Sequence, residues 1–152
     1  MNLRIGIQHT ADADPDVPLP SYETAGAAGA DVRANLPGKA PVLLAAGERA
    51  LIPTGLQMDI PAGYEVQVRP RSGLALKHGI ALVNAPGTID SDYRGAVGVI
   101  VLNTSDTAFE ITHAMRIAQL VVAPVVQAEF AQVSTLSTSA RGAGGFGSTG
   151  QV

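Results

Sequence analysis

Glycine and proline interrupt this chain so often that it cannot form long helices. The 152 residues include 17 glycines and 10 prolines, and both residue types destabilise helix interiors. Apolar and polar residues alternate over residues 3–8, which is the period of a half-buried strand. Clusters of turn residues, such as 53–55 and 61–63, bound the apolar stretches. The sequence therefore predicts an all-β domain of sandwich or barrel type. Further strands are expected at residues 49–52, 63–68, 97–102, 109–111 and 120–125.

One short helix and a polar tail complete the predicted organisation. The helix covers residues 72–78, barely two turns, with Ser72 placed as its N-cap. After Val133 the composition changes to Ser, Thr, Ala and Gly, which is too polar and too glycine-rich to pack as core. We therefore expect a core domain over residues 1–135 and a flexible arm over residues 136–152.

Composition and charge exclude several classes of protein. The chain has no cysteine, which rules out disulfides and thiolate zinc sites. Its net charge is −3 with 10 basic residues, so a nucleic-acid partner is not expected. The longest apolar stretches, residues 97–102 and 120–126, are far shorter than the roughly 18 residues of a spanning helix, and the N-terminus lacks a signal pattern. We expect a cytoplasmic protein with no membrane partner.

Two short segments combine residues that can bind anions or metals. Asp31 follows three small residues and is either an ordinary turn acid or a metal partner. The segment 71–73, Arg-Ser-Gly, places a guanidinium and a hydroxyl at the start of the short helix. This arrangement fits an anion site, although a simple helix cap would also explain the serine.

Two further segments carry chemistry closer to the C-terminus. Residues 84–95 read as a hairpin whose turn holds two acids, an amide, an aromatic ring and a guanidinium, and Ile89 would anchor it to the core. Solvated loop acids are the alternative. The tail offers Arg141, Ser148 and Thr149 as phosphate donors, and Phe146 either stacks on a flat ligand or is simply exposed.

In their order along the chain, five segments resemble the motifs of the trimeric dUTPase family. The resemblance implies a distorted jelly-roll or β-clip subunit with one short helix. It also implies a homotrimer with active sites between subunits, and a C-terminal arm that closes over a neighbouring site. The segments are Asp31 with its Gly–Ala lead, 71–73, 87–95, 116–120 and 141–150.

The same resemblance implies hydrolysis of dUTP to dUMP and pyrophosphate with Mg²⁺, which limits uracil incorporation into DNA and supplies dUMP for thymidylate synthesis. Asp90 would activate the attacking water, Gln119 would help to hold it, and Asp31 would engage the magnesium through water. Asn84 would contact uracil, and Tyr93 would pack against the deoxyribose. Substrate contacts are implied for Arg71, Ser72, Gly73, Asn84, Thr88, Ile89, Tyr93, Arg141, Phe146, Gly147, Ser148 and Thr149.

One departure from the family and two rival functions stand beside this interpretation. Ala114-Met115 occupies a turn where the family commonly has glycine and an acid, and alanine tolerates a positive φ poorly. The related dCTP deaminase carries a glutamate at the position of Ile100, which cannot move protons. A non-catalytic nucleotide-binding trimer could lose the base, whereas Asp90 and Gln119 are both present here.

Overall fold

The expected all-β domain with one short helix is confirmed. The computed structural model describes residues 3–145, which form ten strands, one α-helix and one 3-10 turn. In chain order these are β1 (Gly6–His9), β2 (Ala30–Arg33), η1 (Pro37–Lys39), β3 (Val42–Leu44), β4 (Arg49–Asp59), β5 (Tyr64–Arg69), α1 (Ser72–His78), β6 (Ile80–Leu82), β7 (Gly87–Ile89), β8 (Val97–Asn103), β9 (Phe109–Ile111) and β10 (Arg116–Pro124).

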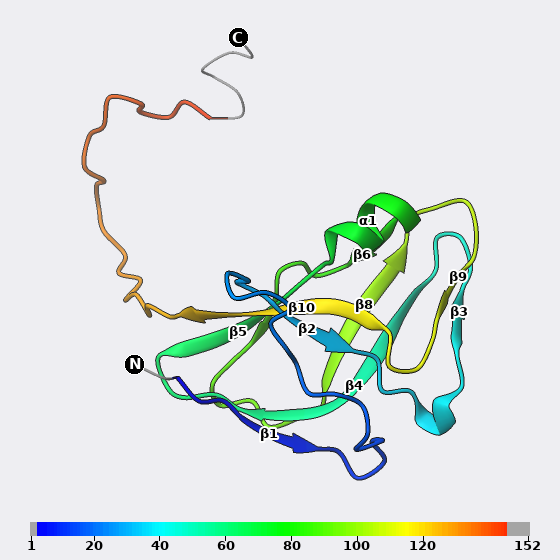
Figure 1. Ribbon diagram of the computed structural model, residues 1–152. Helices are drawn as coiled ribbons and strands as arrows, with labels where there is room; N and C mark the ends of the chain where they lie inside the picture. Colours follow the sequence, from blue (N-terminus) through cyan, green and yellow to red (C-terminus); the bar gives the residue numbers. More distant parts are fainter. Residues whose placement is uncertain (1–2, 146–152) are drawn as a thin grey trace.

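Two four-stranded antiparallel sheets share one core. Their strand orders are β1-β4-β8-β6 and β2-β10-β5-β7, and β3 with β9 forms a separate ribbon at the end of the body away from the C-terminal segment (Figure 1). In β8, Val97, Val99 and Val101 are buried while the residues between them face outward. This alternation seals one face of the strand against the core, as period-2 patterning requires.

The structure confirms most predicted elements and adds others. The helix has the predicted bounds and ends at Gly79, whose φ of 65° is the left-handed cap conformation. The first strand begins at Gly6 rather than at residue 3. Strands β2, β3, β6 and β7 were not predicted, because each has only three or four residues and too little alternation to stand out.

The predicted turn at residues 53–55 is wrong, because these residues lie inside β4. The pairing of β4 with β8 shifts register between Pro53 and Leu56, which is a β-bulge. Thr54 is buried and donates its hydroxyl to the Val97 carbonyl at 2.6 Å. Gly55 has φ +68° and lies so close to Asn35 that a Cβ would come within 2.8 Å. The Pro-Thr-Gly signal therefore marks a bulge within a continuous strand.

Two other local predictions are wrong for reasons of backbone bonding. Arg71, not Ser72, is the N-cap of α1, since the Arg71 carbonyl already accepts the first helical bond from Ala75 at 3.0 Å. Residues 84–95 do not form a hairpin, because β7 pairs with β5 in one sheet while β8 pairs with β4 and β6 in the other. Residues 90–95 form a loop that crosses between the sheets.

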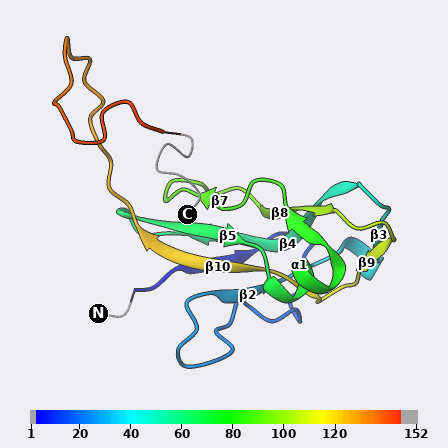
Figure 2. The ribbon, with the colours of Figure 1, turned by 90° about the horizontal axis from the view of Figure 1, so that it is seen from above.

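Regular structure ends before the predicted domain boundary. Strand β10 ends at Pro124, and residues 125–145 contain no helix or strand and extend away from the body (Figures 1 and 2). Apolar side chains on this segment are exposed, including Val126 at 92% and Phe130 at 98%. The boundary at residue 135 stays a prediction. Among residues 3–145, no helix has the length and apolar character needed to cross a membrane.

A polar network attaches the N-terminal loop to the turn that precedes β10. The Asp14 carboxylate accepts hydrogen bonds from Lys39 Nζ at 2.7 Å and from His113 Nε2 at 3.1 Å. The bond from Lys39 and the Asp16 amide lower the pKa of Asp14 to about 2. His113 Nδ1 accepts from the Leu36 amide at 3.1 Å, so Nε2 carries the ring proton toward Asp14.

The turn before Arg116 keeps a left-handed backbone although its residue is alanine. Ala114 has φ 62°. Its amide donates to the Ala34 carbonyl at 2.9 Å, the Ala34 amide donates to Met115, and Arg33 donates to the Ala114 carbonyl at 2.9 Å. These bonds hold a conformation that costs an L-residue about 1–2 kcal/mol.

We therefore expect Ala114→Gly to raise the free energy of unfolding by about 0.5–1 kcal/mol, because the relief of strain exceeds the added entropy of the unfolded chain. Urea unfolding of the variant and the wild type measures this difference. Ala62→Gly, at an exposed turn residue without positive φ, is the matched control and should lower stability instead. An equal loss of unfolding free energy in both variants would contradict a relief of backbone strain at Ala114.

Candidate functional site

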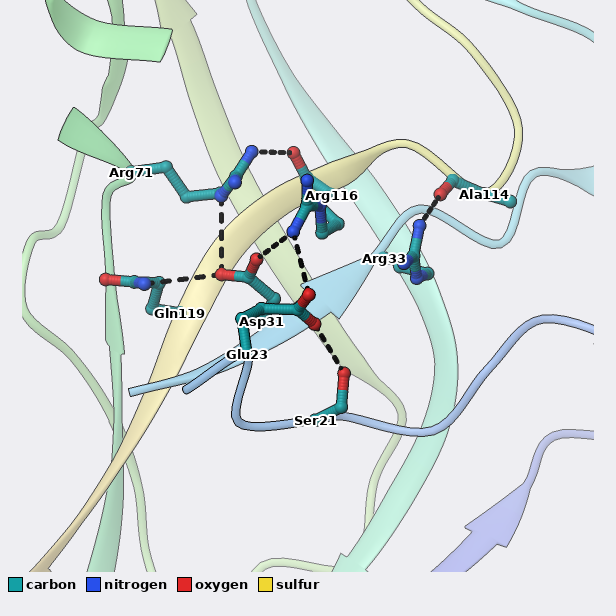
Figure 3. A network of polar contacts seen from close by, with 8 residues as sticks. All are labelled: Ser21, Glu23, Asp31, Arg33, Arg71, Ala114, Arg116 and Gln119. Atoms are coloured by element: carbon teal, nitrogen blue, oxygen red, sulfur yellow. Dashed lines mark hydrogen bonds and ion pairs between the residues drawn. The ribbon is translucent and has the colours of Figure 1, made fainter. Parts of the chain in front are cut away.

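Asp31 is a buried carboxylate surrounded by two arginines and an amide (Figure 3). Only 4% of its surface is exposed. One carboxylate oxygen lies 3.3 Å from Arg71 Nε and accepts from Gln119 Nε2 at 3.3 Å, while the other accepts from Arg116 at 3.0 Å. Three segments far apart in the sequence therefore meet at one negative charge.

Strand pairing brings these groups together. In the β2–β10 ladder Asp31 lies opposite Gln119, and in the β10–β5 ladder Gln119 lies opposite Arg69. Directly opposite residues in antiparallel strands project from the same face of the sheet. Gly29 lets the preceding loop approach, since a Cβ there would lie 3.1 Å from Gln119 Cβ. Gly29, one of the small residues ahead of Asp31, thus has a packing role.

The two arginines keep exposed surface although Asp31 orders them. Arg71 NH1 also donates to the Arg116 carbonyl at 3.2 Å. The side chains of Arg71 and Arg116 remain 26% and 37% exposed, respectively. A guanidinium has five N–H donors, so both groups retain donors for an anion, and their positions are fixed in advance.

The sequence alone gives no role to Arg116 or Glu23. Arg116 NH1 lies 3.2 Å from Glu23, whose other oxygen accepts from the Ser21 hydroxyl at 2.8 Å (Figure 3). Arg116 and Asp31 are separated by 85 positions in the chain. No local spacing could have revealed this contact, because it depends on how β2 pairs with β10.

A second group of predicted residues lines a cleft beside β7. The cleft has a volume of about 190 Å³. Ile89 is 7% exposed and anchors β7 to the core, as expected, opposite Val66 of β5. The residues that line it include Asn84, Thr88, Ile89, Asp90, Tyr93 and Ile100.

Backbone and ring contacts fix Tyr93 within the 90–95 loop. Its amide donates to the Asp90 carbonyl at 3.2 Å, and its hydroxyl donates to the Ala96 carbonyl at 3.1 Å. The ring lies against Gly95, where an added Cβ would overlap it. Asp90 is exposed at the start of this loop. The loop therefore presents a carboxylate and an ordered aromatic ring to one cleft.

The two groups do not meet within one chain. Strand β5 separates β10 from β7, and Gln119 and Ile89 pair with β5 residues three positions apart. These offsets place Gln119 on the order of 14 Å from the start of the 90–95 loop. Ser72 and Gly73 are exposed at the start of α1. Arg141 forms a local turn by donating to the Gly144 carbonyl at 2.7 Å. Phe146, Gly147, Ser148 and Thr149 lie outside the described residues.

The residues around Asp31 suit a cation that binds together with a phosphate ligand rather than one that is held by protein side chains alone. Residues 3–145 contain no cluster of three or more His, Asp or Glu side chains able to hold a metal ion. Both Asp31 oxygens already accept N–H bonds from neighbouring side chains. Mg²⁺ prefers oxygen ligands and keeps much of its water, so Asp31 fits contact through water.

Comparisons with known proteins bear on the identity of this site. A structure of the Staphylococcus bacteriophage 80alpha dUTPase with dUpNHpp has a TM-score of 0.84 and 26% identity, covering 97% of this chain and 98% of that one. The deoxyuridine 5'-triphosphate nucleotidohydrolase of Roseobacter denitrificans is 71% identical over 148 residues, 97% of each chain. The protein of the same name from Dinoroseobacter shibae is 57% identical over 157 aligned positions, covering 99% of each chain.

The sequence pattern of the dUTPase family matches residues 15–150. This range includes Asp31, both arginines of its network and the whole 84–95 segment. The expected resemblance is therefore confirmed, and the chain belongs to the dUTPase family.

Proposed function

We propose that this protein hydrolyses dUTP to dUMP and pyrophosphate with Mg²⁺, as a homotrimer of jelly-roll subunits. The observation that carries the proposal is the cleft where Asp90, Asn84 and Tyr93 lie together, in a chain that also holds a pre-ordered pair of arginines. Hydrolysis of a deoxynucleotide requires a carboxylate that can accept a proton, an amide that can hydrogen-bond the nucleobase, and an aromatic ring that can pack against the sugar.

Positive charge must be placed before a nucleophile can approach a triphosphate. Arg71, Ser72 and Gly73 supply phosphate donors at the start of α1, and Asp31 keeps Arg71 in position at 3.3 Å. Mg²⁺ bound to the phosphate oxygens would lower their negative charge. Asp31 would face this ion through water. The arginine then stabilises charge without reorganising during the reaction.

Asp90 is the general base in this mechanism. It is exposed at the edge of the cleft, so a water molecule can reach its carboxylate. The carboxylate accepts a proton of that water as the oxygen attacks phosphorus, the P–O bond between the α- and β-phosphates breaks, and pyrophosphate leaves. Gln119 helps to orient the water. Removing such a base typically slows a reaction about 10²–10⁴-fold.

The walls of the cleft account for substrate choice. Asn84, Thr88 and Ile89 come from β7 and the turn before it, and they would read the uracil edge and leave no room for a 5-methyl group. Tyr93, fixed by its hydroxyl bond to Ala96, would pack against the deoxyribose and exclude a 2′-hydroxyl. A rigid wall discriminates better than a mobile one, because it cannot relax to accept the larger sugar.

Ile100 argues against the deaminase alternative. It lines the same cleft as Asp90. Deamination of cytosine needs an acid–base group at this position, by the resemblance to dCTP deaminase, and an aliphatic side chain cannot transfer a proton. The cleft therefore favours hydrolysis of the triphosphate over chemistry on the base.

Each complete site draws on two subunits. A water held by both Asp90 and Gln119 requires the two side chains to lie within about 6 Å of each other. Within one chain Gln119 lies on β10 and Asp90 lies in the loop after β7, and strand β5 separates β10 from β7. The outer face of β4 and β8 offers a surface for assembly, since Leu51 of β4 is 66% exposed and Val83, which follows β6 and donates to the Ile100 carbonyl of β8, is 52% exposed. An apolar surface of this kind is typical of subunit interfaces.

The C-terminal segment would serve a neighbouring subunit. Val126, Phe130 and Leu136 are each more than 85% exposed in the isolated chain, and burial on a neighbour would remove this apolar surface from water. Arg141 would then reach the triphosphate, and Phe146 would stack on the uracil. Gly147, Ser148 and Thr149 would supply phosphate donors. The arm would thereby exclude water from the reacting groups.

We expect the purified protein with Mg²⁺ to release pyrophosphate from dUTP, with little release from dCTP, dTTP or UTP and no ammonia from any of them. Asp90→Asn should bind the imido analogue dUpNHpp nearly as well as the wild type while kcat falls about 10²–10⁴-fold, because the amide keeps the shape but cannot accept a proton. Asp92→Asn, two positions along the same loop, is the matched control. Turnover of Asp90→Asn within about twofold of wild type would refute its role as base.

A subunit-mixing experiment tests the shared site. Asp90→Asn and Arg71→Met should each be inactive as pure trimers. In a symmetric ring, mixed trimers of either 2:1 composition contain one site with both residues intact, so about one third of wild-type activity should return. Two affinity tags isolate the mixed trimers for dUTP assay.

Wild-type subunits carried through the same mixing procedure are the control. Mixed trimers as inactive as their parents would place Asp90 and Arg71 of each site on one chain. If light scattering showed a monomer and the assay showed full dUTP hydrolysis by it, a site shared within a trimer would likewise be excluded.

Deletion of residues 141–152 should leave the fold and the trimer intact but strongly reduce kcat, because closure acts on the bound triphosphate more than on the free enzyme. Phe146→Ala alone should be milder, since stacking on a base contributes roughly 1–3 kcal/mol, or about 5- to 150-fold. Steady-state hydrolysis of dUTP measures both, with circular dichroism and sizing as fold controls. Unchanged turnover in a folded truncation would leave the arm without this role.

A further inference from the structure

We propose that Arg94, anchored by Asp59 and Gln57 of β4, is a positioning residue that holds the 90–95 loop and thereby aligns Asp90 and Tyr93. Its effect on catalysis rests on the proposed function. Its effect on the loop can be measured without any activity.

The guanidinium of Arg94 binds three acceptors. Its NH1 group donates to the Ser91 carbonyl at 2.7 Å and to the Tyr93 carbonyl at 3.0 Å. Its NH2 group lies 2.5 Å from the Asp59 carboxylate. The planar fork thus grips the loop on one side and the end of β4 on the other.

Three carbonyls of the loop, those of Ser91, Tyr93 and Arg94, accept hydrogen bonds from the side chains of Arg94 and Gln57. The Arg94 carbonyl accepts from Gln57 Nε2 at 2.7 Å, and the Asp90 carbonyl accepts from the Tyr93 amide at 3.2 Å. The loop crosses between two sheets, so no strand of the described residues 3–145 pairs with it to satisfy these groups. Arg94 and Gln57 supply the donors that a hairpin ladder would have supplied.

The anchor is a rigid part of the fold. Strand β4 has 11 residues and pairs with β1 on one side and β8 on the other. Asp59 lies opposite Gly6, where a Cβ would come within 3.1 Å of Asp59 Cβ, and Gln57 lies opposite Gln8. Since Gln57 and Asp59 are two positions apart, both project from the same face of the strand toward the loop.

The ion-paired side chains that hold the loop are exposed, so they can position the loop while contributing little to the free energy of folding. The Arg94 and Asp59 side chains are 55% and 72% exposed. Ion pairs at such exposure contribute little to folding free energy. A small displacement of a catalytic group, by contrast, can slow a reaction by up to about 10²-fold. Loss of Arg94 should therefore alter the loop and the reaction while leaving global stability nearly unchanged.

Hydrogen–deuterium exchange of the ligand-free protein tests the structural part. In Arg94→Met, amides of residues 90–96 should exchange about tenfold faster than in the wild type, because local opening becomes easier. Arg94→Lys should fall between them, since it keeps the charge but not the fork. Asp59→Asn should also accelerate exchange. Arg4→Met is the matched control, because Arg4 is exposed and has no side-chain hydrogen bond or ion pair among residues 3–145.

Steady-state kinetics with dUTP and UTP test the functional part. Arg94→Met should lower kcat for dUTP about 10- to 100-fold with KM changed less than kcat, and the melting temperature should move by less than about 2 °C. The ratio of kcat/KM for dUTP over UTP should fall, because a displaced Tyr93 no longer excludes the 2′-hydroxyl. A purely structural role would not change this ratio.

Each result decides one part of the inference. Unchanged exchange at residues 90–96 in Arg94→Met would overturn it, and so would faster exchange with unchanged kcat and unchanged dUTP selectivity. If the wild type did not hydrolyse dUTP, the proposed function would fail, and the exchange comparison would still decide whether Arg94 holds the loop.

Discussion

The rest of this structure depends on the hydrogen bonds and ion pairs of the buried Asp31 carboxylate. The carboxylate lies between Arg71, Arg116 and Gln119 and ties the edge strand β2 to β10 and to the start of α1. A buried charge without partners is strongly destabilising, so the partners must be present whenever the strands pair. The same contacts hold two guanidinium groups in position with donors to spare. The bonds that satisfy the buried charge of Asp31 are thus the same ones that, in the proposed function, would order Arg71 for phosphate recognition.

Irregular backbone in this fold is concentrated where side chains replace ladder bonds. At the bulge in β4, the Thr54 hydroxyl donates a hydrogen bond to a backbone carbonyl. At the left-handed turn at Ala114, the Arg33 side chain and the Ala34 backbone form hydrogen bonds with the turn. In the crossing loop 90–95, the side chains of Arg94 and Gln57 donate hydrogen bonds to backbone carbonyls. In each case a backbone group that no strand satisfies obtains a side-chain or loop partner, as burial and order require.

A division of labour follows from this arrangement. One sheet face carries the groups suited to phosphates, and the cleft beside β7 carries those suited to a base and a sugar. Assembly of three subunits would bring a phosphate group of one chain to the base cleft of another. Rigid loops on each side then matter more than flexible ones, because an active site shared between chains has no covalent connection to correct a misplaced residue.

The sequence by itself determined the strand-rich class, the bounds of the helix, and the segments that carry chemistry, because alternation, glycine and proline act locally. It could not determine that residues 53–55 are a bulge or that residues 84–95 join two sheets, since both depend on which strands pair. Neither the Arg116–Asp31 pair, 85 positions apart, nor the anchoring of Arg94 by Asp59 has a local signal. Only the tertiary structure decided them, because a hydrogen bond or ion pair depends on distance in space and not on separation along the chain.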